Sequence, residues 1–142
     1  FYPLNEETNF KINQIFRKLT KNKKQSSKNL EIKGRIFTIE NYFNKTARFD
    51  FDHLCNKNIG AEDYIKIAEV CDFIVIENIP KFNDENINKQ QRFITLIDIL
   101  YEKKISLMTS SYTDLENLGS SRALIGAFKR TLSRLFELTS IN

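Results

Sequence analysis

The chain has 142 residues, 41% of them hydrophobic, and a net charge of +4 at pH 7, so we expect one domain, 1–142, with a core of its own. Two cysteines and one histidine are too few for a disulfide framework or a Cys/His zinc site. No stretch approaches the roughly 20 apolar residues that a membrane-spanning helix needs. The sequence opens on Phe1 and not on methionine, so we expect it to be a portion of a longer protein.

Apolar residues with a 3.6-residue period predict an amphipathic helix from about Glu6 to Leu19. A basic segment follows at about 21–29, within a region (residues 1–50) that holds 11 Lys and Arg against 5 Asp and Glu. Such a cluster can contact phosphates or an acidic membrane surface. Because no aromatic residue interrupts it, we interpret 21–29 as a solvated loop and regard nucleic acid as the less favoured partner.

The next two segments, 30–39 and 46–51, are rich in β-branched and aromatic residues that roughly alternate with polar ones. This pattern predicts short antiparallel strands. A helix then opens after Gly60 and continues to about Val70, with acidic residues in its first turn, where they favour the helix dipole.

A strand, a crossover helix and a second strand are predicted in the centre of the chain. Residues 73–76 form an uninterrupted apolar run that ends near Pro80, as expected of a strand covered on both faces. An apolar helical face spans about 88–102, and the second strand is predicted at 105–109. This order gives a right-handed parallel pair. The predicted class is therefore α/β, with a central parallel βαβ unit, an antiparallel β element near 30–51 and flanking helices.

A last helix is predicted from about Ala123 to Leu138. Six apolar residues should face inward: Leu124, Ile125, Phe128, Leu132, Leu135 and Phe136. Arg130, Arg134 and Glu137 are spaced i, i+4, i+7 and so share one face. Two arginines held on a rigid helix can bind phosphate oxygens or a partner's carboxylate. The alternative is an Arg134–Glu137 surface pair worth only roughly 0.2–0.5 kcal/mol.

Catalytic motifs are scarce in this sequence. It lacks the G-x-x-x-x-G-K-[ST] loop, so it cannot cradle phosphates by that mechanism. Polar residues do follow both central strands, Glu77 after the first and Ser110 after the second, where open α/β sheets bind ligands. These two are the candidate cofactor-binding residues, although helix capping by Ser111 or Thr113 and ordinary turn chemistry explain the same pattern. We assign no metal ligands.

Several longer segments form a linked set of motifs. They are Phe49–Cys55 with Ile59–Tyr64, the strand end Ile76–Pro80, the helical segment Arg92–Tyr101 and the closing Phe128–Ser140. In their residues, order and spacing they resemble the ZapE/AFG-like family of P-loop ATPases, over nearly the whole chain. Lys129 and Leu138 depart from the acid or Gln and the Met that the family has there, and neither departure touches the two arginines.

The resemblance implies the carboxy-terminal part of an AAA-type ATPase, with the P-loop in an upstream half of the same protein. It implies ATP and magnesium as cofactors of that longer protein, and a chain that is inactive by itself. It also raises Arg134 and Arg130 to candidate catalytic residues. The partners and location it implies are a homo-oligomer, a protein of the division machinery, and a cytoplasmic position with peripheral association at the inner face of the bacterial membrane, or a mitochondrial position in a eukaryote.

Two other classes of function stay open at this point. One is a protein-interaction module that docks the division machinery. The other, less favoured, is a nucleic-acid-binding module that uses the basic amino-terminal third.

Overall fold

The computed structural model describes residues 1–19, 26–56 and 58–139. The helices are α1 (Glu6–Leu19), α2 (Phe51–Cys55), α3 (Ala61–Val70), α4 (Ile87–Glu102) and α5 (Ile125–Thr139), with short 3₁₀ turns η1 (Asp84–Asn86) and η2 (Leu115–Asn117). The strands are β1 (Ser26–Ile32), β2 (Arg35–Phe43), β3 (Thr46–Asp50), β4 (Phe73–Ile79) and β5 (Ser106–Ser111). Within these ranges, no helix is both long and apolar enough to cross a membrane.

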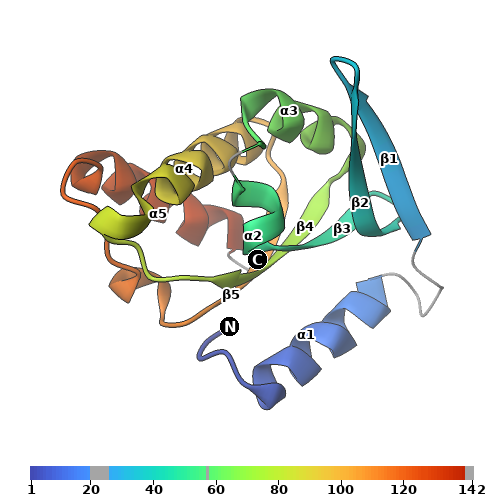
Figure 1. The fold of residues 1–142 in the computed structure, drawn as a ribbon. Helices are drawn as coiled ribbons and strands as arrows, with labels where there is room; N and C mark the ends of the chain where they lie inside the picture. Colours follow the sequence, from blue (N-terminus) through green and yellow to red (C-terminus); the bar gives the residue numbers. More distant parts are fainter. Residues whose placement is uncertain (20–25, 57, 140–142) are drawn as a thin grey trace.

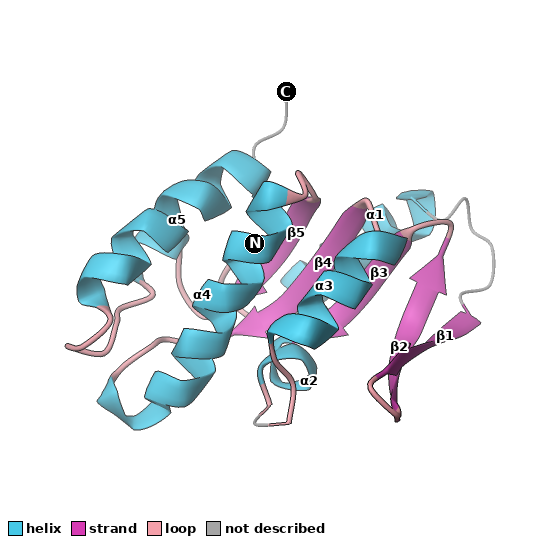
Figure 2. Cartoon of the chain, turned by 90° about the horizontal axis from the view of Figure 1, so that it is seen from above, coloured by secondary structure: helices cyan, strands magenta, loops and turns pink. Residues whose placement is uncertain are grey.

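The five strands form one sheet in the order β1-β2-β3-β4-β5. Strands β1, β2 and β3 pair antiparallel, whereas β3, β4 and β5 pair parallel. Helix α1 lies on one face of the sheet and α2 to α5 lie on the other (Figure 1, Figure 2). The predicted α/β class is confirmed, as are the adjacent parallel strands joined by a helix and the antiparallel amino-terminal part.

The first predicted strand, 30–39, is in fact the centre of a hairpin. Lys33 and Gly34 adopt positive φ angles of 48° and 80° and connect β1 to β2. Glycine reaches this left-handed region without a steric penalty, which allows the tight turn. The alternating pattern correctly predicts strand conformation on both sides of the turn. Because the pattern continues through Lys33 and Gly34, it does not reveal the turn.

Two further boundaries differ from the prediction. Strand β1 begins at Ser26, inside the predicted basic loop 21–29, because its backbone pairs with that of β2; residues 20–25 of that loop lie outside the described residues. Strand β3 ends at Asp50, one residue before the predicted end. The Asp50 carboxylate accepts the N–H of Asp52 at 3.0 Å and so caps α2, and capping favours the start of a helix over the continuation of a strand.

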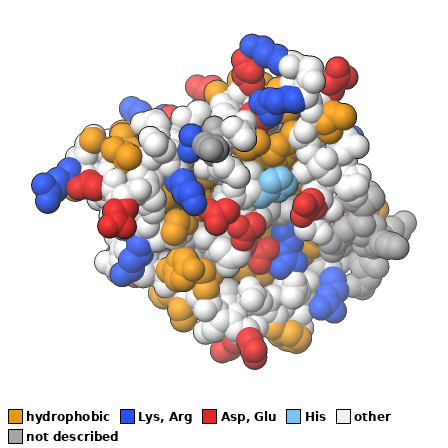
Figure 3. Space-filling model, viewed as in Figure 1, with side chains coloured by type: hydrophobic (Ala, Val, Ile, Leu, Met, Phe, Trp, Pro, Cys, Tyr) orange, Lys and Arg blue, Asp and Glu red, His pale blue; other side chains and the backbone are white. Residues whose placement is uncertain are grey.

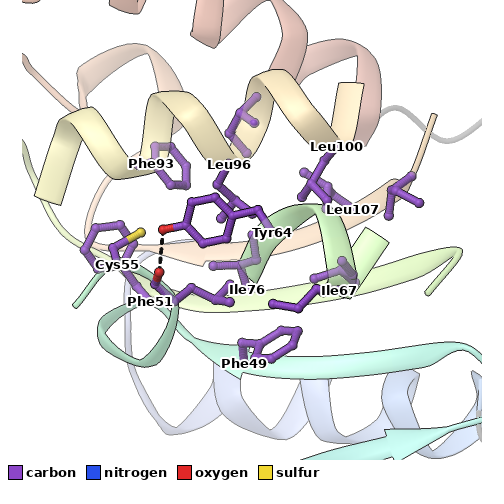
Figure 4. Packing of buried hydrophobic residues seen from close by; sticks show 14 of the residues in the cluster. Phe49, Phe51, Cys55, Tyr64, Ile67, Ile76, Phe93, Leu96, Leu100 and Leu107 are labelled. Atoms are coloured by element: carbon purple, nitrogen blue, oxygen red, sulfur yellow. Dashed lines mark hydrogen bonds between the residues drawn. The ribbon is translucent and has the colours of Figure 1, made fainter. Parts of the chain in front are cut away.

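The main core fills the space between the sheet and helices α2 to α5. Tyr64 of α3 is fully buried there, packed among residues such as Phe93 and Leu96 of α4 (Figure 4). Its hydroxyl donates a hydrogen bond to the carbonyl of Leu54 at 2.5 Å, the dashed line in Figure 4. This bond satisfies the one polar atom that the side chain carries into the core.

A second, smaller core lies between the sheet and α1. Ile12 and Phe16 of α1 are fully buried against Val75 of β4. Strand β4 is therefore covered on both faces, which explains the continuous apolar run at 73–76.

We predict that Tyr64→Phe lowers the free energy of unfolding by about 1–2 kcal/mol, because it removes the hydroxyl and leaves the buried Leu54 carbonyl without its donor. Urea unfolding would measure the loss. The matched control is Tyr112→Phe, since the Tyr112 side chain is exposed and its loss should stay within about 0.5 kcal/mol. Equal effects of the two substitutions would contradict the assigned role of the Tyr64 hydroxyl.

Candidate functional site

The carboxyl ends of β3, β4 and β5 meet at one edge of the sheet and border a cleft of about 860 Å³. This is the position at which open α/β sheets bind ligands. Polar and charged side chains contribute most of the lining, among them Asp50, Asp52, Asn78, Asn86, Lys89 and Arg92. The cleft is therefore the candidate site that the strand order by itself creates.

Glu77, the predicted acid at the end of β4, does not line this cleft. Its carboxylate forms a two-pronged ion pair with Arg48 of β3, in which Arg48 Nε donates to Oε1 and Nη2 donates to Oε2 at 3.0 Å. The same guanidinium donates from Nη1 to Asn13 Oδ1 of α1 at 2.5 Å and lies 5.6 Å from the centre of the Phe16 ring. Both side chains are mostly buried, with 12% of Glu77 and 18% of Arg48 exposed. Glu77 thus fastens α1 to the sheet.

Ser110, the second predicted cofactor-binding residue, is fully buried. Its Oγ accepts the backbone N–H of Asn78 at 3.0 Å. Asn78 has a positive φ of 65° at an irregularity between β4 and β5, and its side chain donates to Asp50 Oδ1 at 2.5 Å. Ser110 therefore fixes the backbone at the end of β4 without lining the cleft itself. Asn78 and Asp50 are the strand-end residues that line the cleft. The assignment of Glu77 and Ser110 to cofactor binding stays a prediction.

The neighbouring Ser111 and Thr113 were the alternative candidates as caps of a short helix. Ser111 Oγ donates to the Thr113 carbonyl at 2.5 Å, which is a turn contact. The 3₁₀ turn η2 is preceded by Asp114, whose carboxylate accepts from the Asn117 side chain at 2.6 Å. Turn chemistry, rather than capping by Ser111 or Thr113, accounts for this segment.

The two candidate arginines lie on α5 and not in the cleft, whose lining contains no α5 residue. Arg134 Nη1 donates to Asp98 Oδ1 of α4, and its guanidinium carbon lies 4.8 Å from the centre of the Tyr101 ring. Arg130, one turn earlier, is exposed and has no ion pair or hydrogen bond with the described part of the chain. The partner of Arg134 is thus Asp98, not Glu137.

The Glu137 carboxylate instead acts on Tyr101, whose pKa it raises through hydrogen bonding and its negative charge. The apolar stripe of α5 is also narrower than predicted. Leu135 is fully buried, but Ile125 and Phe136 are 57% and 44% exposed. Both lie at the margin of the apolar stripe of a helix that packs mainly on α4 and β5.

The cysteines and the histidine do not form a reactive group. Cys55 and Cys71 are buried, and burial raises the pKa of each thiol to about 12, so neither is a thiolate nucleophile at neutral pH. His53 stacks on the Phe37 ring with centroids 4.9 Å apart. No group of three or more potential metal ligands occurs within residues 1–19, 26–56 and 58–139.

The two basic side chains that line the cleft, Lys89 and Arg92, have partners within the chain. Lys89 Nζ donates to Asp52 Oδ1 at 3.0 Å, and Arg92 Nη1 donates to the Cys55 carbonyl at 3.5 Å. Basic and acidic side chains are interspersed over the face shown in Figure 3. Among the described residues visible in this view, no single-sign patch of the kind that binds nucleic acid is present.

Comparison with known proteins adds a family to this geometry. The model of a family described as AFG1-like ATPase matches residues 1–142. The Cell division protein ZapE of Escherichia coli strain K12 is 28% identical over 138 residues, which cover 97% of this chain and 37% of that protein. Lactation elevated protein 1 homolog B of Danio rerio is 29% identical over 129 residues, 89% of this chain and 26% of that protein. The chain thus spans little more than a third of the first of these relatives. No solved structure matches it significantly.

We predict that Glu77→Ala lowers the free energy of unfolding by about 2–4 kcal/mol, because it leaves the largely buried Arg48 charge without its partner. Chemical denaturation of wild type and variant would measure this. Glu62→Ala is the control, since Glu62 pairs with Lys33 where both side chains are more than half exposed, and such a pair contributes roughly 0–1 kcal/mol. A Glu77→Ala protein as stable as the Glu62→Ala protein would contradict the fastening role.

Proposed function

The chain belongs to the AFG1-like ATPase family, and from this premise we propose that it is an accessory, carboxy-terminal part of an ATPase whose P-loop lies in an upstream half of the same protein. The observation that carries the proposal is a family match over all 142 residues combined with a sequence that has no P-loop motif. ATP and magnesium are the cofactors of the longer protein in this proposal. Phosphoryl transfer in P-loop ATPases relies on a phosphate-binding loop and a magnesium ion, and this sequence contains no such loop.

The contribution we propose for this chain is an arginine of α5 directed at the nucleotide phosphates. Arg134 is the first candidate because its guanidinium is already oriented, by the carboxylate of Asp98 on one side and by the Tyr101 ring beneath it. Nη1 is used by Asp98, while Nε and Nη2 have no acceptor in the described part of the chain. A guanidinium held in one orientation loses little freedom when it binds a phosphate.

Arg130 is the second candidate, with the opposite properties. It is exposed and has no partner among the described residues, so it is free to reach a separate subunit or the upstream half. An oligomer in which α5 of one subunit faces the nucleotide of the next would use it in this way. Arginines supplied to a phosphoryl-transfer site increase the rate by about 10³–10⁵.

A second candidate function is a protein-docking module. Ile125 and Phe136 leave apolar surface exposed on α5, which suits a protein partner. The Escherichia coli relative ZapE is named as a cell division protein. On this proposal the partner belongs to the division machinery and the protein acts in the cytoplasm beside the membrane; a eukaryotic relative would act in the mitochondrion.

We predict that the 142-residue chain by itself does not hydrolyse ATP. The measurement is phosphate release by the purified chain with ATP and magnesium. Turnover that persists in Glu77→Ala, Arg130→Ala and Arg134→Ala preparations would indicate a contaminating ATPase. Turnover that disappears in one of these variants would contradict the prediction and identify a catalytic site within the chain.

For the longer protein, we predict that Arg134→Ala reduces ATP turnover by at least about tenfold, and up to the roughly 10³–10⁵ of a transition-state arginine, and that Arg130→Ala reduces it less. The comparison that separates catalysis from stability is Asp98→Ala. It removes the same ion pair, so it should cost similar stability. The guanidinium stays present but loses the carboxylate that orients it, so we expect a smaller loss of turnover than in Arg134→Ala.

Thermal midpoints and turnover are measured on the same samples. If Arg134→Ala and Asp98→Ala lose equal turnover, or if Arg134→Ala keeps wild-type turnover, Arg134 is structural and the catalytic role is wrong. Arg134→Lys is expected to rescue little, because an ammonium keeps the charge but cannot present the planar pair of donors.

A further inference from the structure

The outer edge of β5 is the end of the sheet, and the first residue of the chain already lies along it (Figure 1). The Phe1 amino group donates to the carbonyl of Thr109 at 2.7 Å, and the N–H of Ser111 donates to the carbonyl of Phe1 at 2.9 Å. Bonds from one residue to the two neighbours of a residue on the next strand make the ladder of a parallel pair. Phe1 therefore lies beside Ser110 in the position of a parallel strand.

Only part of this edge is used. Thr109 and Ser111 turn main-chain groups outward to Phe1, so Leu107, two residues earlier, turns its own groups to the same edge. The N–H groups of Ser106 and Tyr112 point the other way and bond to carbonyls at the two ends of β4. The carbonyl of Leu107 and the N–H groups of Leu107 and Thr109 thus form an open template for a further strand.

A groove of about 940 Å³ follows the same edge. Its walls are largely apolar on both faces of the sheet, formed by Ile15, Phe73 and Met108 on the α1 side and by Leu107, Phe136 and Leu138 on the α5 side. A parallel strand is normally covered by apolar side chains on both faces. The groove offers an apolar strand that environment.

We propose that the segment immediately preceding Phe1 in the longer protein occupies this groove as a sixth strand, parallel to β5. The inference rests on the proposed function, in which an upstream half of the protein is joined to this chain. Continued with the same register, the second residue before Phe1 lies beside Met108, donates to the Leu107 carbonyl and accepts the N–H of Thr109. The fourth residue before Phe1 lies beside Ser106 and accepts the N–H of Leu107.

Three observations favour this occupant over a second copy or a separate peptide. Phe1 pairs with β5 in the parallel direction, so the residues that precede it continue directly into the groove. A strand from another chain would have to share the same edge with Phe1 and end where Phe1 begins. Burial lowers the pKa of the Phe1 amino group, and a peptide N–H in its place would make the same bond without desolvating a charge. The chain covers 37% of the length of the Escherichia coli relative, so a protein of that size has residues to supply the strand.

The test is a disulfide trap in the full-length protein. One cysteine is placed at the second residue before Phe1 and the other by Met108→Cys. Paired residues of neighbouring strands lie about 5 Å apart and on one face, within the range of a disulfide. We expect an intramolecular crosslink under mild oxidation. The control moves the first cysteine to the residue directly before Phe1, whose side chain points to the opposite face, and should not crosslink.

Hydrogen exchange of the unmodified full-length protein gives an independent readout. It requires no substitution and so does not depend on whether a cysteine variant folds. The amides of Thr109 and Leu107 should exchange at least about tenfold more slowly than free amides, as we also expect of Met108, which pairs with β4. Rapid exchange of Thr109 and Leu107 beside a protected Met108, or a crosslink only between two molecules, would overturn the proposal. Neither readout depends on nucleotide. An absent strand with arginine-dependent turnover therefore refutes this inference alone, and a present strand with arginine-independent turnover refutes only the catalytic role.

Discussion

Parallel pairing of β3, β4 and β5 is the constraint on which the rest of the molecule depends. Parallel strands cannot be joined by short turns, so each connection must cross over one face through a helix. The helices that result bury Tyr64, Phe93 and their neighbours on one face, while α1 buries Val75 on the other. The same pairing sends three carboxyl ends to one edge, where the polar cleft forms. The cleft and the placement of the connecting helices α2, α3 and α4 thus follow from one choice of strand direction.

Two of the polar residues at those strand ends, Glu77 and Ser110, make structural contacts within the chain. Glu77 neutralises Arg48 and, through it, connects β3, β4 and α1. Ser110 satisfies the backbone N–H of Asn78, which the irregularity in β4 would otherwise leave without a partner. Leaving a buried carboxylate or N–H unpaired is costly, so these groups cannot be released cheaply for a ligand. Asp50 and Asn78 face the cleft instead.

Two surface features, on α5 and at the outer edge of β5, keep hydrogen-bonding groups that the described residues do not use. Arg130 and the free donors of Arg134 lie on α5, away from the cleft, and the chain contains no loop to hold the phosphates they could bind. The outer edge of β5 bears an apolar groove and unfilled main-chain positions. Arginine helix and open strand edge are complementary in this respect. In the proposed function and in the proposed sixth strand, each would meet a segment outside this chain, which spans little more than a third of the length of its relative in Escherichia coli.

The sequence by itself determined what local periodicity encodes: the full span of α1, the buried run of β4, the crossover helix α4 and the α/β class, because burial of a face imposes a repeat that can be counted along the chain. Its motifs also indicated the family. It did not disclose the turn at Lys33–Gly34, where one alternating pattern serves two strands. Only the tertiary structure decided that Glu77 pairs with Arg48, 29 residues away, and Arg134 with Asp98, 36 residues away. Such partners are chosen by strand register and helix packing, which bring together residues that no spacing in the sequence relates.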